Sequence, residues 1–252
     1  MNIVKRQPRI LCLDLETSAL LSWTWGVYET NVIEVAQTWY ILCYAYRWLG
    51  EKTKWVGLPD FIGYKPNTCD TKQFIKSLWD LVDEADIIIA QNGDKFDIPK
   101  FKTRFIHYNL HPPTPFKTVD TLKVARKFGF PSNKLDNLGL AMGEGRKVKH
   151  TGFSLWKGCM AGDKKSWDTM KRYNIQDVDL LARIYKRFLP WISNHPSLAV
   201  YCEGRVCPRC QSPNVFKVGM EYNNTMVYQR YRCKECHAPS RGKEGKPVAE
   251  LR

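Results

Sequence analysis

Runs of continuous or alternating apolar residues mark the predicted strands in the first two hundred residues. Residues 10–16 form a near-continuous apolar run that ends in acids, which is typical of a central strand buried on both faces. Residues 40–48 and 52–56 flank a short turn and predict an antiparallel hairpin. Two more short strands are expected at 86–90 and 117–120. These segments together predict a sheet that contains antiparallel pairs.

Helical periodicity follows the strands. A helix capped by Thr71 or Asp70 is predicted after the hairpin, a second helix covers about 99–109, and a long helix covers about 166–191. Strands followed by helices in this order predict a mixed α/β sheet flanked by helices.

Acids occupy several positions of these elements where the pattern favours apolar residues. Asp14 and Glu16 share one face of the first strand, because alternate residues of a strand point to the same side. Asp177 lies in the apolar stripe of the last helix, one turn after Tyr173. Asp97 follows a polar segment between a strand and a helix, where a helix N-cap is the alternative. Neighbouring buried carboxylates repel one another unless a cation neutralises them, which favours a shared divalent metal ion.

The nine cysteines fall into two populations, five scattered residues and two C-x-x-C pairs. An odd count argues against a disulfide framework, and four thiolates complete a tetrahedral shell around structural zinc. Alternating residues and a turn at 223–224 predict a hairpin between the pairs, as in a zinc ribbon. The alternatives are two unrelated C-x-x-C matches or a redox motif. His237, next to Cys236, could replace one ligand, but four thiols already suffice. The predicted zinc ligands are Cys207, Cys210, Cys233 and Cys236.

Lys and Arg number 39 against 25 Asp and Glu, so the formal net charge is 39 − 25 = +14. A basic excess on a folded chain favours a nucleic-acid partner. Residues 205–252 carry ten Lys or Arg and four Asp or Glu, or +6, with Phe216, Tyr222, Tyr228 and Tyr231 among them. These aromatic residues either stack on bases or fill the small core of the ribbon.

No apolar run approaches the roughly 20 residues that cross a bilayer, and the N-terminus lacks the apolar core of a signal peptide. We therefore expect a cytoplasmic protein without membrane contact. A domain boundary is expected between His195 and Arg205, which gives domains of 1–196 and 197–252. Residues 239–247 are expected to be a flexible basic tail.

Three segments resemble, in order and spacing, the exonuclease motifs of the DEDDy 3′-to-5′ exonucleases, which have an RNase H-like fold. They are Leu13–Thr17, Asn92–Asp97 and Tyr173–Asp177, and Lys134–Leu138 resembles the stretch that often precedes the third motif. The resemblance covers about residues 8–192 and is closest to the stand-alone enzymes of phages and bacteria and to the proofreading domains of family B DNA polymerases. Typical members lack a zinc ribbon.

The resemblance implies two-metal hydrolysis of phosphodiester bonds with release of nucleoside 5′-monophosphates. Asp14 would contact both Mg²⁺ or Mn²⁺ ions, Glu16 and Asp177 would complete the first metal site, and Asp97 would hold the second ion mainly through water. Tyr173 would orient the attacking water. The catalytic residues that it implies are Asp14, Glu16, Asp97, Tyr173 and Asp177. Its implied contacts to the terminal nucleotide are Thr17, Asn92 and Phe96.

Several alternatives stay open at this level. DNA is favoured over RNA as the substrate, and the strandedness, the oligomeric state and any replication or repair partner are undetermined. A structure-selective endonuclease and a non-catalytic nucleic-acid-binding protein are the rival functions. Trp23, Trp25 and Tyr28 either stack on bases or pack their loop onto the core. The basic stretch at 123–149 either follows a nucleic-acid backbone or is a solvated surface.

Overall fold

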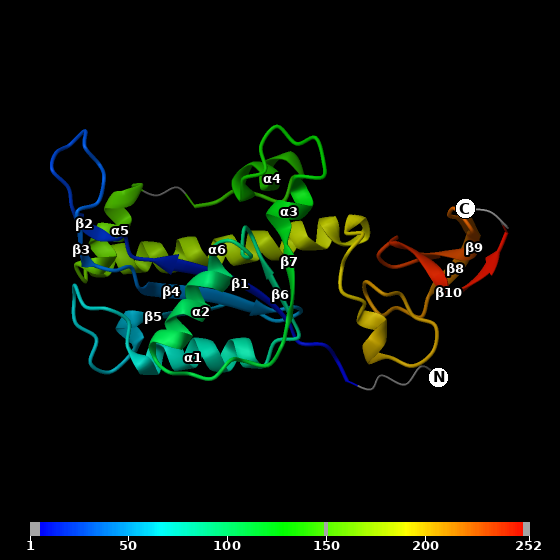
Figure 1. Cartoon of the computed structure of the whole chain (residues 1–252), viewed down its shortest axis with the longest axis horizontal. Helices are drawn as coiled ribbons and strands as arrows, with labels where there is room; N and C mark the ends of the chain where they lie inside the picture. The colour runs from blue at the N-terminus through cyan, green and yellow to red at the C-terminus, as the bar shows by residue number, and fades with distance from the viewer. Residues whose placement is uncertain (1–5, 149–150, 249–252) are drawn as a thin grey trace. The chain divides into compact units, whose positions relative to one another are not determined.

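The computed structural model describes residues 6–148 and 151–248. Residues 9–184 form one compact unit, and the described residues from 185 onward belong to a second unit. The first unit is a three-layered α/β arrangement in which helices cover both faces of a sheet (Figure 1).

The central sheet has five strands in the order β5-β4-β1-β6-β7. The middle strand, β1 (Ile10–Thr17), pairs antiparallel with β4 (Ile41–Trp48) and parallel with β6 (Ile87–Ala90). The edges are β5 (Lys54–Gly57) and β7 (Lys117–Asp120). The sheet is therefore mixed, as the sequence predicts, and every predicted strand is found within a few residues of its expected bounds.

The apolar run of β1 is buried because helices cover both faces of the sheet. Figure 1 shows α6 (Lys164–Phe188) on one side and α1 (Lys72–Asp83) and α2 (Asp97–His107) on the other. The α6 helix ends before the predicted residue 191 because Pro190 lacks a backbone N–H and terminates the regular hydrogen-bond pattern. The remaining helices are the short α3 (Thr121–Ala125), α4 (Leu135–Ala141) and α5 (Phe153–Met160) and the 3₁₀ turns η1 (Leu58–Asp60), η2 (Leu189–Trp191) and η3 (Leu198–Tyr201).

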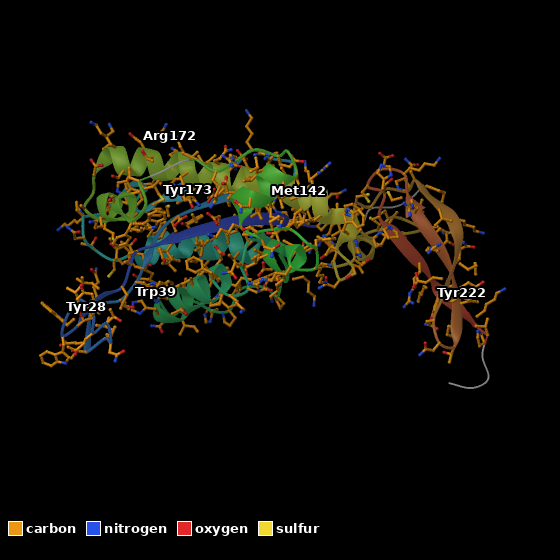
Figure 2. All side chains as sticks on the ribbon, turned by 90° about the horizontal axis from the view of Figure 1, so that it is seen from above. Tyr28, Trp39, Met142, Arg172, Tyr173 and Tyr222 are labelled. Atoms are coloured by element: carbon orange, nitrogen blue, oxygen red, sulfur yellow. The ribbon has the colours of Figure 1, made fainter. Side chains whose placement is uncertain are left out.

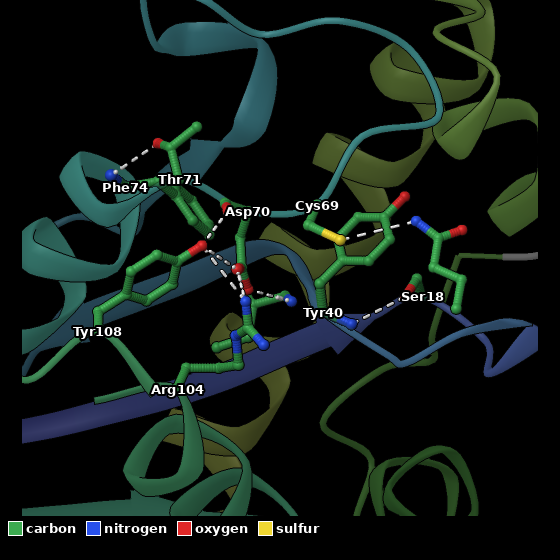
Figure 3. A network of polar contacts seen from close by, with 10 residues as sticks. Ser18, Tyr40, Cys69, Asp70, Thr71, Phe74, Arg104 and Tyr108 are labelled. Carbon is green, nitrogen blue, oxygen red and sulfur yellow. Dashed lines mark hydrogen bonds and ion pairs between the residues drawn. The ribbon is translucent and has the colours of Figure 1, made fainter. Parts of the chain in front are cut away.

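A buried polar network ties the start of α1 to the sheet and to α2 (Figure 3). Thr71 is the N-cap of α1 and accepts from the backbone N–H of Phe74 at 3.3 Å. The carboxylate of Asp70 pairs with Arg104 of α2 and accepts from the backbone N–H of Ile41 at 2.9 Å. Asp70 therefore joins three elements instead of capping the helix.

A two-stranded hairpin of β2 (Leu21–Trp23) and β3 (Glu34–Gln37) follows β1 directly. Trp23 is 65% exposed, Trp25 82% and Tyr28 98%, and Tyr28 is labelled on this hairpin in Figure 2. The expectation that these aromatic residues pack onto the core is therefore wrong. The apolar residues of this segment face outward, so the core gives it no periodic pattern from which strands could be predicted.

The second unit contains a three-stranded antiparallel sheet with the order β10-β9-β8. The predicted hairpin is formed by β8 (Val215–Tyr222) and β9 (Met226–Cys233). Residues 239–247 are not a flexible tail, because β10 (Pro239–Pro247) pairs with β9. Gly245 permits this pairing, since a Cβ there would lie 2.5 Å from Cε1 of Tyr228. Across the described part of the chain, no helix has the length and apolar character needed to cross a membrane.

Candidate functional site

Three acidic side chains from two elements meet at the end of the central strand. Asp14 and Glu16 come from one face of β1, and Asp177 comes from the buried stripe of α6. One carboxylate oxygen of each residue lies within 4.8 Å of the others. The structure thus brings together the acids of the first and third sequence motifs.

Neighbouring side chains hold these carboxylates in place. The side-chain amide of Asn174 donates to Oδ2 of Asp14 at 2.6 Å, and the indole N–H of Trp156 donates to Oε2 of Glu16 at 3.2 Å. Asn174 is fully buried and follows Tyr173 in α6. Each of these two acids therefore has a fixed rotamer and retains a second oxygen for another ligand.

Asp97 lies beside the same strand. Its Oδ1 accepts from the backbone N–H of Leu15 at 2.9 Å, between the two acids of β1. It is the first residue of α2 and not the N-cap, which is Phe96. Asp97 is not part of the group within 4.8 Å, but its charge raises the pKa of both Asp14 and Glu16. The structure therefore places Asp97 next to the three-acid cluster.

Burial and neighbouring acidic charges raise the pKa values of Asp14, Glu16 and Asp97. Burial is the largest cause for all three shifted groups, and it raises the pKa of Glu16 to about 8 and that of Asp97 to about 7. The pKa of Asp14 is raised well above its usual value by burial, followed by the charges of Glu16 and Asp177. A divalent cation would offset this repulsion and hold the carboxylates ionised.

The ammonium group of Lys147 points at the cluster. Nζ of Lys147 lies 2.5 Å from Oδ2 of Asp177 and donates to the hydroxyl of Tyr173 at 3.0 Å. The backbone N–H of Lys147 is fixed by Oδ1 of Asp136 at 2.8 Å. Burial and the acidic charges raise the pKa of Tyr173, so its hydroxyl stays protonated and can donate a hydrogen bond.

The donor set fits a hard divalent cation. Carboxylate oxygens are the ligands that Mg²⁺ and Mn²⁺ prefer, and three of them converge here at a half-buried strand end. Lys147 brings one positive charge to Asp177, and a divalent cation would bring two charges to the same group of carboxylates. Asp14, Glu16 and Asp177 are therefore suited to hold a metal ion together.

The three predicted nucleotide contacts are partly exposed around this cluster. Thr17 ends β1, and Asn92 and Phe96 belong to the loop between β6 and α2. Asn92 has a positive φ of 63°, and a Cβ at Gly93 would lie 2.4 Å from that of Ala90. The tight loop therefore needs glycine at position 93 to bring the start of α2 against the sheet.

The four predicted zinc ligands also converge. The Sγ atoms of Cys207, Cys210, Cys233 and Cys236 all lie within 4.8 Å of one another. Two of the S–S separations are 3.5 and 3.6 Å, close to the about 3.8 Å edge of a tetrahedron with Zn–S bonds of about 2.3 Å. Each C-x-x-C pair is followed by a residue with positive φ, Gln211 or His237, which gives the two turns the same backbone shape.

This cysteine cluster fits one metal ion with a closed shell. The backbone N–H of Arg209 donates to Cys207 and that of Glu235 donates to Cys233, both at 3.4 Å. These bonds stabilise thiolates without using a coordination position. Among the described residues, His237 is not one of the clustered ligands.

Sequence reasoning missed three residues of the acidic site. Asn174 lies inside the third motif but is not one of its predicted metal ligands, and Trp156 carries no sequence signal for its contact with Glu16. The sequence marks Lys147 only as part of a basic stretch, whose Lys149 lies outside the described residues. The hydrogen bond from the backbone N–H of Lys147 to Asp136 gives the Lys134–Leu138 segment a structural role.

Comparisons with known proteins agree with this fold. Residues 46–189 match the sequence profile of the RNase H superfamily, which is more than half of the chain. A search of curated proteins found no match. The structure is similar to that of the family B DNA polymerase from the hyperthermophilic archaeon Pyrobaculum calidifontis, with a TM-score of 0.56 and 16% sequence identity.

The structural match covers 87% of this chain and 32% of that chain, so this protein spans about a third of the polymerase's length. At this identity the likeness shows the fold alone. The profile match begins after β1 and includes Asp97, Tyr173 and Asp177. This chain belongs to the RNase H superfamily.

Proposed function

We propose that this protein is a metal-dependent 3′-to-5′ exonuclease that releases nucleoside 5′-monophosphates from nucleic acid, with DNA favoured. The observation that carries the proposal is the convergence of Asp14, Glu16 and Asp177 within 4.8 Å at the end of β1. The order of the three sequence motifs supports the end-directed, 3′-to-5′ mode. Residues 1–196 would form the catalytic domain and 197–252 the zinc ribbon.

Asp14, Glu16 and Asp177 would hold one Mg²⁺ or Mn²⁺ ion, and Asp14 with Asp97 would hold a second. When bound, two such ions would supply an activated water nucleophile and stabilisation of the leaving 3′ oxygen of a phosphodiester. Asn174 and Trp156 orient the carboxylates through the hydrogen bonds described above. These two residues therefore position the metal-binding carboxylates.

Tyr173 would orient the attacking water through its protonated hydroxyl. Its raised pKa makes it a poor general base at neutral pH and a stable hydrogen-bond donor. Lys147 reaches both the tyrosine hydroxyl and Asp177. With a metal ion held by Asp177, the ammonium group of Lys147 would be available to bind a phosphate oxygen of the substrate.

The terminal nucleotide would lie against Thr17, Asn92 and Phe96. The basic character of the chain, +14 overall, supports binding of a polyanion. Nζ of Lys100, on the helix that follows Phe96, lies 3.6 Å from the ring centroid of Trp39 and 5.7 Å from that of Phe96. This pair of rings around a cation supports a nucleotide-binding role for the loop.

A 5′-labelled single-stranded DNA oligonucleotide incubated with Mg²⁺ or Mn²⁺ tests the proposal. Wild-type protein should give a ladder of products that shortens from the 3′ end, and Asp177→Asn should lower the rate by at least about 10²-fold. Asp179→Asn is the matched control, because Asp179 lies two residues away in α6 and pairs with Arg47 and Thr53 outside the cluster.

The products separate the rival functions. A single internal cut would indicate an endonuclease, and binding without cleavage under all metal conditions would indicate a non-catalytic protein. Either result contradicts the proposal. A parallel RNA oligonucleotide tests the preference for DNA.

A further inference from the structure

One face of the ribbon sheet gathers arginine side chains. Residues alternate between the two faces of β9, so Arg230 and Arg232 share a face, while Tyr231 and Cys233 belong to the other. Both arginines are exposed, and their neighbours Tyr231 and Cys233 are more buried. The arginine-bearing side of the sheet therefore faces solvent.

The strand register adds a third arginine and an aromatic ring to this face. Arg241 of β10 lies directly opposite Arg230, and Phe216 of β8 lies directly opposite Arg232. Directly opposed residues in antiparallel strands have Cβ atoms about 5 Å apart. Arg230, Arg232, Arg241 and Phe216 thus form one cluster, which we call the arginine face.

This arrangement is unfavourable for the ribbon alone. Like charges placed directly opposite each other destabilise a strand pair, which is the situation of Arg230 and Arg241. Glu221 pairs with Arg241 at 3.3 Å, and the guanidinium of Arg241 lies 4.4 Å from the ring centroid of Tyr228. Among the described residues, no acidic side chain lies within ion-pair distance of Arg230 or Arg232. Within residues 6–148 and 151–248, the guanidinium groups of Arg230 and Arg232 therefore have no ion-pair partner.

The chemistry of the face matches a polyanion with exposed bases. Guanidinium groups bind phosphate oxygens through two parallel hydrogen bonds, which a lysine cannot do. Phe216 is 41% exposed beside Arg232, and an exposed aromatic ring stacks on an unpaired base. A duplex hides the faces of its bases, so the ring favours a single strand.

We infer that the arginine face of the ribbon binds single-stranded nucleic acid, with Arg230, Arg232 and Arg241 on phosphates and Phe216 on a base. The inference rests on the proposed nuclease function, because the bound single strand would be the substrate of that nuclease. It adds a second binding surface, built on the ribbon and separate from the acidic cluster in sequence.

The test uses the full chain with Asp14→Asn, so that the probe is not degraded, and a fluorescein-labelled single-stranded DNA of mixed sequence. Arg230→Gln with Arg241→Gln should weaken binding about tenfold at 0.15 M salt. It should also reduce the slope of log K against log salt by about 1.4, because each lost phosphate contact removes about 0.7 for single strands.

The matched control removes the same charge from the other face. Lys217 is opposite Tyr231 and Lys246 is opposite Val227, so both lie on the face away from the arginines. Lys217→Gln with Lys246→Gln should weaken binding less than threefold. Arg230→Lys with Arg241→Lys keeps the charge and tests folding, and it should retain most of the salt dependence.

Phe216→Leu tests the stacking contact. Loss of one stacked base corresponds to at least about fivefold weaker binding, and a duplex of the same length should bind with unchanged affinity. Equal affinities for the arginine and lysine double variants would overturn the inference.

The binding and cleavage experiments can refute the two proposals independently. In a chain that keeps Asp14, Arg230→Gln with Arg241→Gln should cleave a four-nucleotide probe at the normal rate. The same variant should bind longer strands weakly. If wild-type protein cleaves nothing but the arginine face still governs binding, the proposed nuclease function fails and the binding surface stands.

Discussion

Glu16 provides the sharpest test of the electrostatics of the acidic site. Its pKa is raised from 4.5 to about 8, first by burial and then by the charge of Asp177. A shift of this size corresponds to about 5 kcal/mol of free energy between the two protonation states. Because the pKa is higher in the folded state, the folded protein retains a proton that the unfolded chain releases between pH 4.5 and about 8. Stability should therefore fall as pH rises through this window.

Glu16→Gln removes this ionisation and keeps an oxygen that can accept from the indole N–H of Trp156. Without added Mg²⁺ or Mn²⁺, the variant should match wild type near pH 5. At pH 9 it should be more stable by at least about 2 kcal/mol, or about 4–8 °C in Tm for a unit of this size. Relaxation around the ionised carboxylate makes this lower bound smaller than the full 5 kcal/mol.

Thermal unfolding at pH 5, 7 and 9, with and without Mg²⁺, measures the difference. Addition of Mg²⁺ should raise the Tm of wild type most at pH 9 and have a smaller effect on the variant. Glu51→Gln, which changes an exposed glutamate outside the cluster, is the control. If wild type and Glu16→Gln keep the same Tm difference at every pH, the repulsion deduced for this site is wrong.

Three further substitutions test other contacts. Lys147→Met removes a charge that lowers the pKa of Glu16, so the pH–rate profile with Mg²⁺ should move to higher pH, and an unmoved profile would exclude this coupling. Cys233→Ser should reduce the bound zinc measured by atomic absorption and weaken binding of long strands more than cleavage of short ones. Equal activity of Cys233→Ser and wild type on oligonucleotides of every length would contradict a substrate-binding role of the ribbon. Arg104→Ala removes the cation that pairs with the buried carboxylate of Asp70 and should lower the free energy of unfolding, measured by urea titration, by about 3–5 kcal/mol. A loss below about 1 kcal/mol would be inconsistent with a stabilising Arg104–Asp70 pair.

Much of the fold follows from local pattern. The face of α1 is an example, because Thr71 caps the helix and its apolar residues at the predicted spacing are buried, namely Phe74, Ile75, Leu78, Leu81 and Val82. The stripe of α6 is another, since its residues at steps of three and four are buried, namely Met170, Tyr173, Asp177, Leu181, Ile184 and Phe188. Burial forces the apolar residues of an amphipathic helix onto one face, so their spacing records which side meets the core.

The hairpin after β1 and the strand β10 escaped prediction for a common reason. Their residues are largely exposed, so no buried face imposes an alternation on the sequence. The pairing of β10 depends on the contact between Gly245 and Tyr228, which lie far enough apart in sequence that no local pattern reports it.

The amino-acid sequence by itself determined the elements that meet the core, the two C-x-x-C pairs and the acids placed in the apolar patterns of β1 and α6. Only the tertiary structure decided which acids share a site, because Glu16 and Asp177 are 177 − 16 = 161 positions apart in the sequence and only the packing of α6 on the sheet brings them together. It also decided that Lys147, Asn174 and Trp156 surround the cluster. Periodicity reports how each segment meets the core, whereas the chemistry of a site depends on side chains from segments whose contacts are set by long-range packing.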